Sequence, residues 1–330
     1  WGARIASLAP SVRSHFGSSA FLLLRLFCLD ARKLPGGPVV VVPSMYAPRR
    51  FVYALRISFL LCMTVGASTV EQTVLVTGAT GRTGALLYNQ LKDAGVRVRG
   101  LVKNVTKARQ LLNCDKCDSS EGIFVADITK KDTLGPAMQG ATALAIVTSS
   151  VPICDPFPHC SFPKGGEPIN VDWLGQKNQI EAFAESRGKG QALGPVVLCS
   201  TMGTTEPEDG KGGIPGFIGF YKLNAEAFLM SSGVPFTIVK PCGLGNGPAG
   251  KQELVVGHDD SLQLDPPMIA RADVARVMAG ALQSGELAAG LRFDLCAKSS
   301  GTPTADVREV LRAAHYPWEK AAAPTSAELI

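Results

Sequence analysis

Short runs of apolar residues recur along the chain between residues 73 and 295, and most of them end at a glycine or a polar turn. The runs are rich in Val, Ile and Leu and lack the polar alternation of a strand that faces water on one side. This pattern predicts buried strands at 73–77, 97–102, 123–126, 143–147, 196–199, 236–239 and 291–295.

Segments with apolar residues at helical spacing separate these runs. In 82–94, for example, Leu87, Leu91 and Ala94 fall on one helical face. The same reasoning predicts helices at 82–94, 105–112, 130–138, 171–186, 220–231, 272–283 and 305–314. Strands that alternate with helices of this length form parallel βαβ units, so we expect an α/β fold with a doubly wound parallel sheet.

Three segments interrupt this alternation. Residues 151–170 and 204–219 are rich in Gly, Pro and polar residues, and they follow the fourth and fifth predicted strands. Because ligands bind at the carboxyl ends of the strands in such sheets, we expect these two segments to frame the substrate side. Residues 243–267 form a third irregular stretch, predicted to be part of a small C-terminal lobe over the cleft.

The charge of the chain is unevenly distributed. Residues 1–70 contain eight basic residues and one acid, a net charge of +7, so the total of +5 leaves −2 for residues 71–330. This part of the chain therefore lacks the basic surface that nucleic-acid binding requires. With 46% hydrophobic residues in a chain of 330, wholesale disorder is also excluded, and 71–330 is expected to form a single domain.

Residues 1–70 have the composition of a targeting leader: basic, Ser-rich and almost free of acids. One interpretation is a signal peptide that starts at Met45, a candidate translation start, and is cleaved near Ala67. The other is an organelle transit peptide, with a plastid favoured over a mitochondrion. Arg25 and Arg56 interrupt the apolar runs before these reach the length of a membrane span, so no integral span is expected in the mature chain.

The motif with the clearest chemistry is TGATGRTG, between the first predicted strand and the first helix. Gly78 permits a tight turn, Gly81 lets the backbone approach a pyrophosphate, and Gly84 allows close helix packing. The helix start offers unpaired N–H groups to a phosphate. This spacing predicts a Rossmann fold whose loop binds a dinucleotide. The loop's candidate contacts are Gly78, Thr80, Gly81, Arg82, Thr83 and Gly84.

The end of the second predicted strand indicates which dinucleotide is bound. An acid there would bind the 2′-hydroxyl of NAD, whereas a basic residue accommodates the 2′-phosphate of NADP. The chain has Lys103 at this place and no acid. NADP is therefore the predicted cofactor, the alternative being that Lys103 is a solvated surface charge.

Several further segments resemble one protein family. Together with TGATGRTG, they are LVKN, VADIT, IVTSSVP, VDWLGQKNQI, KLNAEAFLMSSGVPFTIVKPCGL and RADVA, spread over residues 72–315. They resemble the atypical short-chain dehydrogenases/reductases of the NmrA-like, NAD(P)-binding group of plants and algae. The resemblance implies that Asp127 and Ile128 lie against the adenine and that Thr148 and Ser149 line the cofactor. It also implies that Lys222 contacts the nicotinamide ribose.

The chain departs from the superfamily at its catalytic tyrosine. Active reductases use Tyr-x-x-x-Lys, in which the tyrosine exchanges a proton with the substrate. Counting back from Lys222 gives Ile218, and Tyr221 points elsewhere on a helix. The catalytic candidates are therefore Lys222 with Ser200 or Thr201 in the superfamily's Ser/Thr role.

Cysteine and histidine provide weaker candidates. Cys114 and Cys117 have the spacing of a redox pair or of half a metal site. A metal would need further ligands, such as Cys154, His159 and Cys160, and nothing in the pattern brings these together. No metal site is therefore assigned. A full disulfide framework is not expected, because Cys199, Cys242 and Cys296 end apolar strands, where cysteine is a small buried hydrophobe. His258, Asp259 and Asp260 could reach a substrate, but a solvated loop is the preferred interpretation.

The favoured hypothesis is an NADP-binding oxidoreductase that acts on a small carbonyl or quinone-type substrate. The alternative is a non-catalytic, NADP-dependent redox sensor or scaffold with a protein partner, motivated by Ile218. Epimerase or dehydratase chemistry on a nucleotide sugar also fits the fold, but it usually needs the same missing tyrosine.

Overall fold

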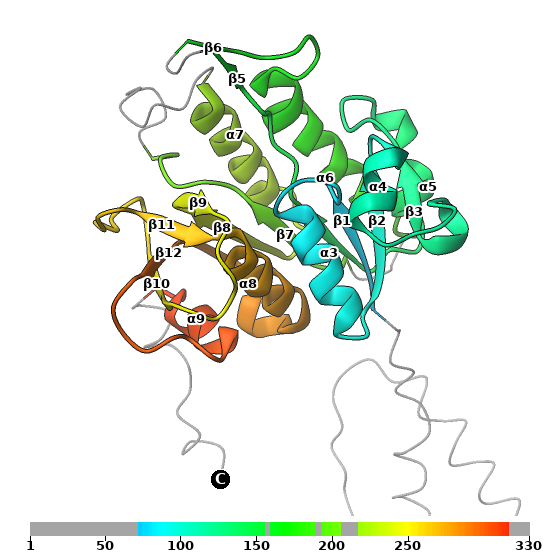
Figure 1. The fold of residues 1–330 in the computed structure, drawn as a ribbon. Helices are drawn as coiled ribbons and strands as arrows, with labels where there is room; N and C mark the ends of the chain where they lie inside the picture. Colours follow the sequence, from blue (N-terminus) through cyan, green and yellow to red (C-terminus); the bar gives the residue numbers. More distant parts are fainter. Residues whose placement is uncertain (1–71, 156–158, 189–192, 206–216, 317–330) are drawn as a thin grey trace, which may run out of the picture. The chain divides into compact units, whose positions relative to one another are not determined.

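The computed structural model describes residues 72–155, 159–188, 193–205 and 217–316. Its centre is an eight-stranded sheet in the order β10-β12-β8-β7-β4-β1-β2-β3 (Figure 1). All neighbouring strands are parallel except β10, which is antiparallel to β12. The strands of this sheet are β1 Thr73–Thr77, β2 Arg97–Val102, β3 Ile123–Val125, β4 Ala143–Ile146, β7 Val196–Cys199, β8 Phe236–Pro241, β10 Glu253–Gly257 and β12 Leu291–Lys298. The predicted doubly wound parallel sheet is confirmed.

Helices cover both faces of the sheet, as Figure 1 shows for α3 and α8 on one face and α6 and α7 on the other. Their bounds are α3 Gly84–Asp93, α4 Val105–Leu111, α5 Gly135–Met138, α6 Gln176–Glu185, α7 Ile218–Ser231, α8 Arg271–Gln283 and α9 Val307–Ala313. Short 3-10 turns lie at Ser119–Glu121, Lys131–Thr133 and Gly285–Ala288. None of the helices in the described ranges is long and apolar enough to cross a bilayer.

The two faces of the sheet bury two separate hydrophobic cores. Along β1, the side chains of Val74 and Val76 join one core, which includes Leu87 of α3. Leu75, between them, joins the other core with Phe183 of α6. Because successive side chains of a strand point to opposite faces, the continuous apolar runs in the sequence are the signature of this two-sided burial.

Two predicted helices differ from the observed ones. Residues 130–138 form a 3-10 turn followed by the four-residue helix α5, which Gly135 and Pro136 begin. Residues 171–186 begin as a π-helical segment, η4 (Ile169–Gly175), which continues directly into α6. π-helical turns inside helices are frequent at functional sites, and this one lies beside the cavities described below.

The stretch 243–267 is more ordered than predicted. It contains β9 (Gly243–Gly245), which pairs with β11 (Met268–Ala270), and it contains β10, the edge strand of the main sheet. The prediction of an irregular lobe was therefore wrong for these residues. β10 has only one buried residue, Leu254, so its sequence lacks the apolar run that marks the central strands.

Two other predicted segments fall partly or wholly outside the described residues. The predicted leader, 1–70, lies outside them, as does most of the predicted loop 204–219. In the segment 151–170 the described part contains a short hairpin of β5 (Ile153–Cys154) and β6 (Cys160–Ser161), followed by a turn that leads into η4.

Candidate functional site

The glycine loop lies between β1 and α3, where the chain reverses with little room for side chains. Gly78 has φ +67°, a conformation that favours glycine. A Cβ atom on Gly84 would lie 2.1 Å from the carbonyl oxygen of Gly78. The start of α3 has no side-chain cap, because Thr83 makes no capping hydrogen bond. The loop therefore offers unpaired backbone N–H groups at a helix N-terminus, which suits an anionic group.

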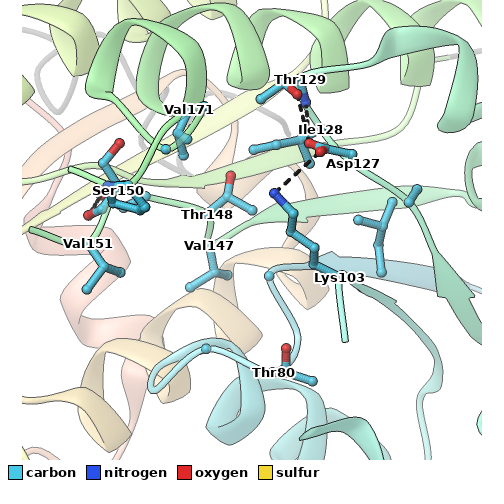
Figure 2. A pocket seen from close by; sticks show the side chains of 18 residues that line it. Thr80, Lys103, Asp127, Ile128, Thr129, Val147, Thr148, Ser150, Val151 and Val171 are labelled. Carbon is cyan, nitrogen blue, oxygen red and sulfur yellow. Dashed lines mark hydrogen bonds and ion pairs between the residues drawn. The ribbon is translucent and has the colours of Figure 1, made fainter. Parts of the chain in front are cut away.

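One side of this loop opens into a cavity of about 310 Å³, here named the Lys103 cavity. Figure 2 shows Thr80 on one side of it, Thr148 and Ser150 on another, and Lys103 reaching across towards Asp127. The predicted cofactor contacts that line it are Gly78, Thr80, Gly81, Lys103, Asp127, Ile128, Thr148 and Ser149. The structure therefore brings together residues from the ends of β1, β2, β3 and β4.

The charged pair in this cavity is open to solvent. The Lys103 Nζ atom lies 3.3 Å from an Asp127 carboxylate oxygen, and the two side chains are 76% and 28% exposed. Burial by itself would raise the pKa of Asp127, but hydrogen bonds from the Thr129 amide and hydroxyl and the charge of Lys103 outweigh it and lower the pKa. Lys103 thus presents a solvent-exposed cation at this cavity, held by a weak, screened ion pair.

The loop 151–170 lines this same cavity. Val151, Pro163, Gly165 and Gly166 lie on the wall opposite the β2 end. The segment therefore lies at the ligand-binding edge of the sheet, and its predicted place on the substrate side stays a prediction.

Side chains from α6 hold the wall of the Lys103 cavity. Gln176 Nε2 donates to the carbonyl oxygen of Thr148 at 3.1 Å, and Gln179 Nε2 donates to the Thr148 hydroxyl at 3.1 Å. On the other side of the cavity, Asn178 Nδ2 donates to the carbonyl oxygen of Ile128 at 2.9 Å. These amides fix the positions of the β3 and β4 ends relative to each other.

A buried ion pair lies behind the end of β4. Asp172 of η4 is fully buried, and its Oδ1 atom lies 3.0 Å from Nζ of Lys222 on α7. The Ser149 hydroxyl donates to Oδ1 at 2.8 Å, and the Ser150 amide donates to Oδ2 at 3.0 Å. Asp172 therefore ties Lys222 to the segment that the sequence predicted to line the cofactor.

Lys222 faces a second cavity, of about 690 Å³, here named the Lys222 cavity. Its walls include three predicted contacts, Thr83, Thr148 and Ser149, which also border the glycine loop or the Lys103 cavity. The remaining lining is mostly apolar or sulfur-containing: Val147, Cys199, Met202, Ile218, Pro241, Cys242, Leu244, Leu262, Pro267 and Met268. A cavity of this size and character suits a small, largely apolar ligand.

The position that holds a tyrosine in active reductases is Ile218 here, and it lines the Lys222 cavity at 6% exposure. Tyr221 is not part of the lining, and its ring packs edge-on against Phe220. Among the described residues that line this cavity, Lys222 and Cys199 carry the ionisable side chains. Burial raises the pKa of the Cys199 thiol, and the nearby charge of Lys222 opposes that shift.

Ser200 and Thr201 both line the Lys222 cavity, but Ser200 is already engaged. Its hydroxyl donates to the buried carboxylate of Glu226, whose other oxygen accepts from Arg292 Nε at 2.8 Å. Arg292 also pairs with Asp259 at 3.1 Å. The Ser200 hydroxyl is thus oriented by a buried carboxylate that also pairs with an arginine.

Six of the seven cysteines in 71–330 form disulfides in the described residues: Cys114–Cys117, Cys154–Cys160 and Cys242–Cys296. The prediction that a disulfide framework is absent was therefore wrong, and Cys199 is the free cysteine. Cys242 follows β8 and its amide donates to Leu295 of the adjacent strand β12, which places the two cysteines side by side. Pairings between residues 54 positions apart depend on the sheet and cannot be read from spacing.

Cys114 and Cys117 lie with Glu121 in a group close enough for metal ligation, but the two sulfur atoms are joined to each other. The Glu121 carboxylate accepts from the amide of Cys117 at 2.7 Å. Cys154 and Cys160, which a metal would have needed as further ligands, are also joined to each other. In this form neither pair supplies thiolates.

The loop 258–260 is anchored rather than solvated. His258 stacks on Tyr316, with ring centroids 3.9 Å apart. Asp260 accepts from Nζ of the fully buried Lys240 at 2.9 Å and from the amides of Gly203 and Thr205. The preferred interpretation of a solvated loop was wrong for Asp260, and none of His258, Asp259 and Asp260 lines the Lys222 cavity.

The residues that sequence reasoning missed are the buried polar groups of η4 and α6. Asp172, Gln176 and Gln179 lie within VDWLGQKNQI at positions i, i+4 and i+7, so they share one helical face. All three are fully buried. A polar stripe on the inner face of a helix was a visible signal, although it does not indicate the partners, which come from the distant residues Thr148 and Lys222.

Comparison with known proteins gives the following matches. A family model described as NAD(P)H-binding matches residues 78–285. An uncharacterised chloroplastic protein of Arabidopsis thaliana is 38% identical over 260 residues, which cover 74% of this chain and 76% of that protein. Sanguinarine reductase of Eschscholzia californica is 34% identical over 267 residues, covering 71% of this chain and 92% of that protein.

Among solved structures, an oxidoreductase from Lactococcus lactis superposes with a TM-score of 0.53. The two are 17% identical, and the match covers 74% of this chain and 99% of the other. At this level of identity the likeness concerns the fold alone.

Proposed function

The chain belongs to the NAD(P)H-binding family, within the atypical, NmrA-like short-chain dehydrogenases/reductases, and from this we propose that it is an NADPH-dependent reductase of a small quinone-type or other conjugated carbonyl compound. The observation that carries the proposal is the junction of the Lys103 and Lys222 cavities at Thr148 and Ser149, beside the uncapped start of α3. A dinucleotide needs two such compartments joined at a phosphate site.

NADP is proposed over NAD because of the charge at the β2 end. Lys103 is 76% exposed at the mouth of its cavity, so its ammonium group can leave Asp127 and meet a 2′-phosphate. Asp127 follows β3, and hydrogen bonds from the Thr129 amide and hydroxyl would still stabilise its carboxylate after Lys103 has left it. The adenosine half would then lie between Thr80, Asp127 and Ile128.

The pyrophosphate is assigned to the glycine loop. Gly81 and Thr83 precede an uncapped helix start, and the tight contact between Gly78 and Gly84 keeps the loop backbone open to a ligand. The nicotinamide half would occupy the Lys222 cavity, where the cofactor would supply hydride. Lys222, fixed by Asp172, would contact the ribose.

Because Ile218 replaces the tyrosine that donates a proton, the Lys222 cavity favours a hydride acceptor that does not need a proton from the protein. Hydride addition to a simple ketone gives a strongly basic alkoxide, which the missing tyrosine would normally protonate. Hydride addition to a quinone gives a phenolate, whose conjugate acid has a pKa near that of tyrosine, about 10, so water can protonate it later. Met202, Met268 and Cys242 also provide polarisable contacts for a flat ring. The reductase named among the relatives supports reduction as the reaction class.

Titration of the purified chain with NADPH and NADH, followed by nucleotide fluorescence, tests the cofactor. We expect NADPH to bind at least about tenfold more tightly, because one charge-assisted contact to the 2′-phosphate contributes roughly 1.5 kcal/mol. Lys103→Glu should remove this preference. The control is Lys92→Glu, which makes the same charge change in the last turn of α3, away from the glycine loop, and should preserve the preference. Equal affinities of the unaltered chain for the two nucleotides would contradict the proposal of NADP.

Oxidation of NADPH by a quinone panel tests the reaction. If the protein is a reductase, it oxidises NADPH when a quinone is present. Lys222→Met should then lower the rate of NADPH oxidation by more than the variant's loss of thermal stability accounts for. A chain that binds NADPH but never turns over would instead support the sensor or scaffold hypothesis. Ile218→Tyr sharpens this result, because it should extend activity to simple ketones if only the proton donor is missing.

We also propose that residues 1–70 are a plastid leader. The support is their net charge of +7 and the fact that one relative is a chloroplastic protein. Sequencing the amino terminus of the protein isolated from its native cells tests it, and a mature start near residue 70 is expected. A start at Met45 would contradict it.

A further inference from the structure

A third cavity, of about 800 Å³, lies on the other side of the glycine loop, and its only charged lining residues are two arginines. It is here named the Arg82 cavity. Arg82 enters from the start of α3 and Arg271 from the start of α8, and Thr80 and Gly81 form the border with the Lys103 cavity. Two guanidinium groups therefore face one space that no carboxylate of the described residues borders.

Arg271 is a buried cation without an acidic partner. Its side chain is 7% exposed, and its Nη1 atom donates to the carbonyl oxygen of Gly245 at 3.2 Å and to Asn246 Oδ1 at 2.7 Å. The nearby Asp273 pairs with Arg276 instead. Within the described ranges, Arg271 forms no ion pair. A buried charge with only neutral partners is costly, which points to a missing anion.

Arg82 adds a second positive charge to the same cavity. Its side chain is exposed and, within the part of the chain that the structure describes, makes no hydrogen bond or ion pair. Burial and the charge of Arg82 both lower the pKa of Arg271. The N-terminal ends of α3 and α8, neither of which has a side-chain cap, add two partial positive charges. Among the described residues, both charged side chains that line this cavity are therefore positive.

We propose that Arg82 and Arg271 together form a phosphate-binding site. Arg82 is one of the predicted cofactor contacts, whereas Arg271 is not. A planar guanidinium fork matches phosphate oxygens, and Asn246 and Asn89 add neutral hydrogen-bonding groups to the same lining. The phosphate comes either from the dinucleotide, whose pyrophosphate would reach the cavity across Thr80 and Gly81, or from a separate small phosphorylated molecule. In the first case the inference rests on the proposed function.

Thermal unfolding of the full chain with inorganic pyrophosphate tests the site. Pyrophosphate is expected to raise the Tm of the unaltered protein, because a ligand that binds the folded state stabilises it. Arg82→Gln and Arg271→Met should each weaken pyrophosphate binding about tenfold or more, since each removes charge-assisted hydrogen bonds. Arg271→Lys keeps the charge but loses the fork, so an intermediate loss is expected.

The control is Lys92→Gln, which removes one positive charge from the far end of α3 and should leave pyrophosphate binding unchanged. Arg82 is exposed, so Arg82→Gln keeps the test informative if the Arg271 variants do not fold. The proposal is overturned if pyrophosphate leaves the Tm of the unaltered chain unchanged, or if it raises the Tm of all variants equally.

Competition with NADPH identifies the source of the phosphate. If NADPH displaces pyrophosphate, and Arg271→Lys weakens both, the site holds the dinucleotide's own phosphate. If pyrophosphate still binds at saturating NADPH, the site serves a separate phosphorylated molecule. If pyrophosphate binds and NADPH does not bind at all, the proposed function fails while the phosphate site stands.

Discussion

The Lys103 and Lys222 cavities share the wall formed by Val147, Thr148 and Ser149, but their ion pairs are built in opposite ways. In the Lys103 cavity the pair with Asp127 is 76% and 28% exposed. In the Lys222 cavity the pair with Asp172 is 6% and 0% exposed, and serine groups satisfy the carboxylate further. The exposed pair can exchange its partner for a ligand, whereas the buried pair is part of the framework.

This difference has an energetic consequence. An exposed pair contributes at most about 1 kcal/mol to stability, because water screens it and the side chains lose conformational entropy. Removal of one partner of a buried pair leaves an uncompensated charge and costs roughly 3–5 kcal/mol. Substitutions at the two cavities should therefore separate ligand binding from folding.

The largest effect is expected where one change breaks both cavities. Gly84→Val places a Cβ atom 2.1 Å from the Gly78 carbonyl oxygen, so β1 and α3 must separate. We expect a loss of more than about 4 kcal/mol in the free energy of unfolding and no measurable NADPH binding. Denaturant unfolding measures this loss.

The matched control for this change is Gly135→Ala, in α5, where an added Cβ meets nothing within 4 Å. A gain of about 0.5–1 kcal/mol is expected there, from the higher helix propensity of alanine. A Gly84→Val chain as stable as the unaltered chain would show that the close contact of the loop is not required.

The next effect concerns the buried pair alone. Asp172→Ala leaves the Lys222 ammonium buried without its carboxylate, so we expect a loss of about 3 kcal/mol in the free energy of unfolding. Combining it with Lys222→Met removes both charges and should recover most of this loss. If the two changes are additive in denaturant unfolding, the ion pair is not the cause.

A smaller effect is expected from Asp260, which anchors the loop 258–260. Burial would raise the pKa of Asp260, but hydrogen bonds from Thr205, Lys240 and Gly203 lower it from 3.8 to about 2. Because the folded pKa is the lower one, the stabilisation is present above pH 4 and is lost as pH falls towards 2. After allowance for solvent screening, Asp260→Asn should cost about 1 kcal/mol at neutral pH.

This cost should shrink below about pH 4, since the unaltered carboxylate is then protonated as the chain unfolds. Denaturant unfolding of both chains over a pH series measures the difference. A difference that stays constant down to pH 2 would mean that the Asp260 carboxylate contributes no pH-dependent stability.

The smallest effect on stability belongs to the exposed pair. Lys103→Gln should change the free energy of unfolding by no more than about 0.5 kcal/mol, since the ion pair with Asp127 is screened. Its NADPH affinity should nevertheless fall, and the fall should diminish at high salt. A loss of stability as large as that of Asp172→Ala would erase the distinction between the two cavities.

The sequence predicted the parts of the molecule whose signal is local. The bounds of β1 and β2 and the position of the glycine loop follow from runs of adjacent residues, and the structure confirms them. The cavity around Lys103 belongs to the same class, because each of its predicted contacts lies within four residues of the end of a strand. Strand ends of a parallel sheet meet at one edge, so the fold itself gathers them.

The parts that could not be predicted depend on pairs of residues far apart in the chain. Asp172 meets Lys222 across fifty positions, and Cys242 meets Cys296 across 54. Each partner alone has an ordinary explanation, as a helix-surface acid or a small buried thiol. Only the packing of η4 against α7, and of β8 against β12, shows that they form pairs.

The wall that Thr148 and Ser149 provide to both cavities implies thermodynamic coupling between their occupants. A nucleotide in one cavity and an acceptor in the other would contact the same short segment, held by Asp172 and by Gln176 and Gln179. If the nucleotide changes the affinity for the acceptor by some factor, the acceptor must change the affinity for the nucleotide by the same factor. Acceptor affinities measured on the nucleotide-free protein should therefore differ from those that operate during turnover.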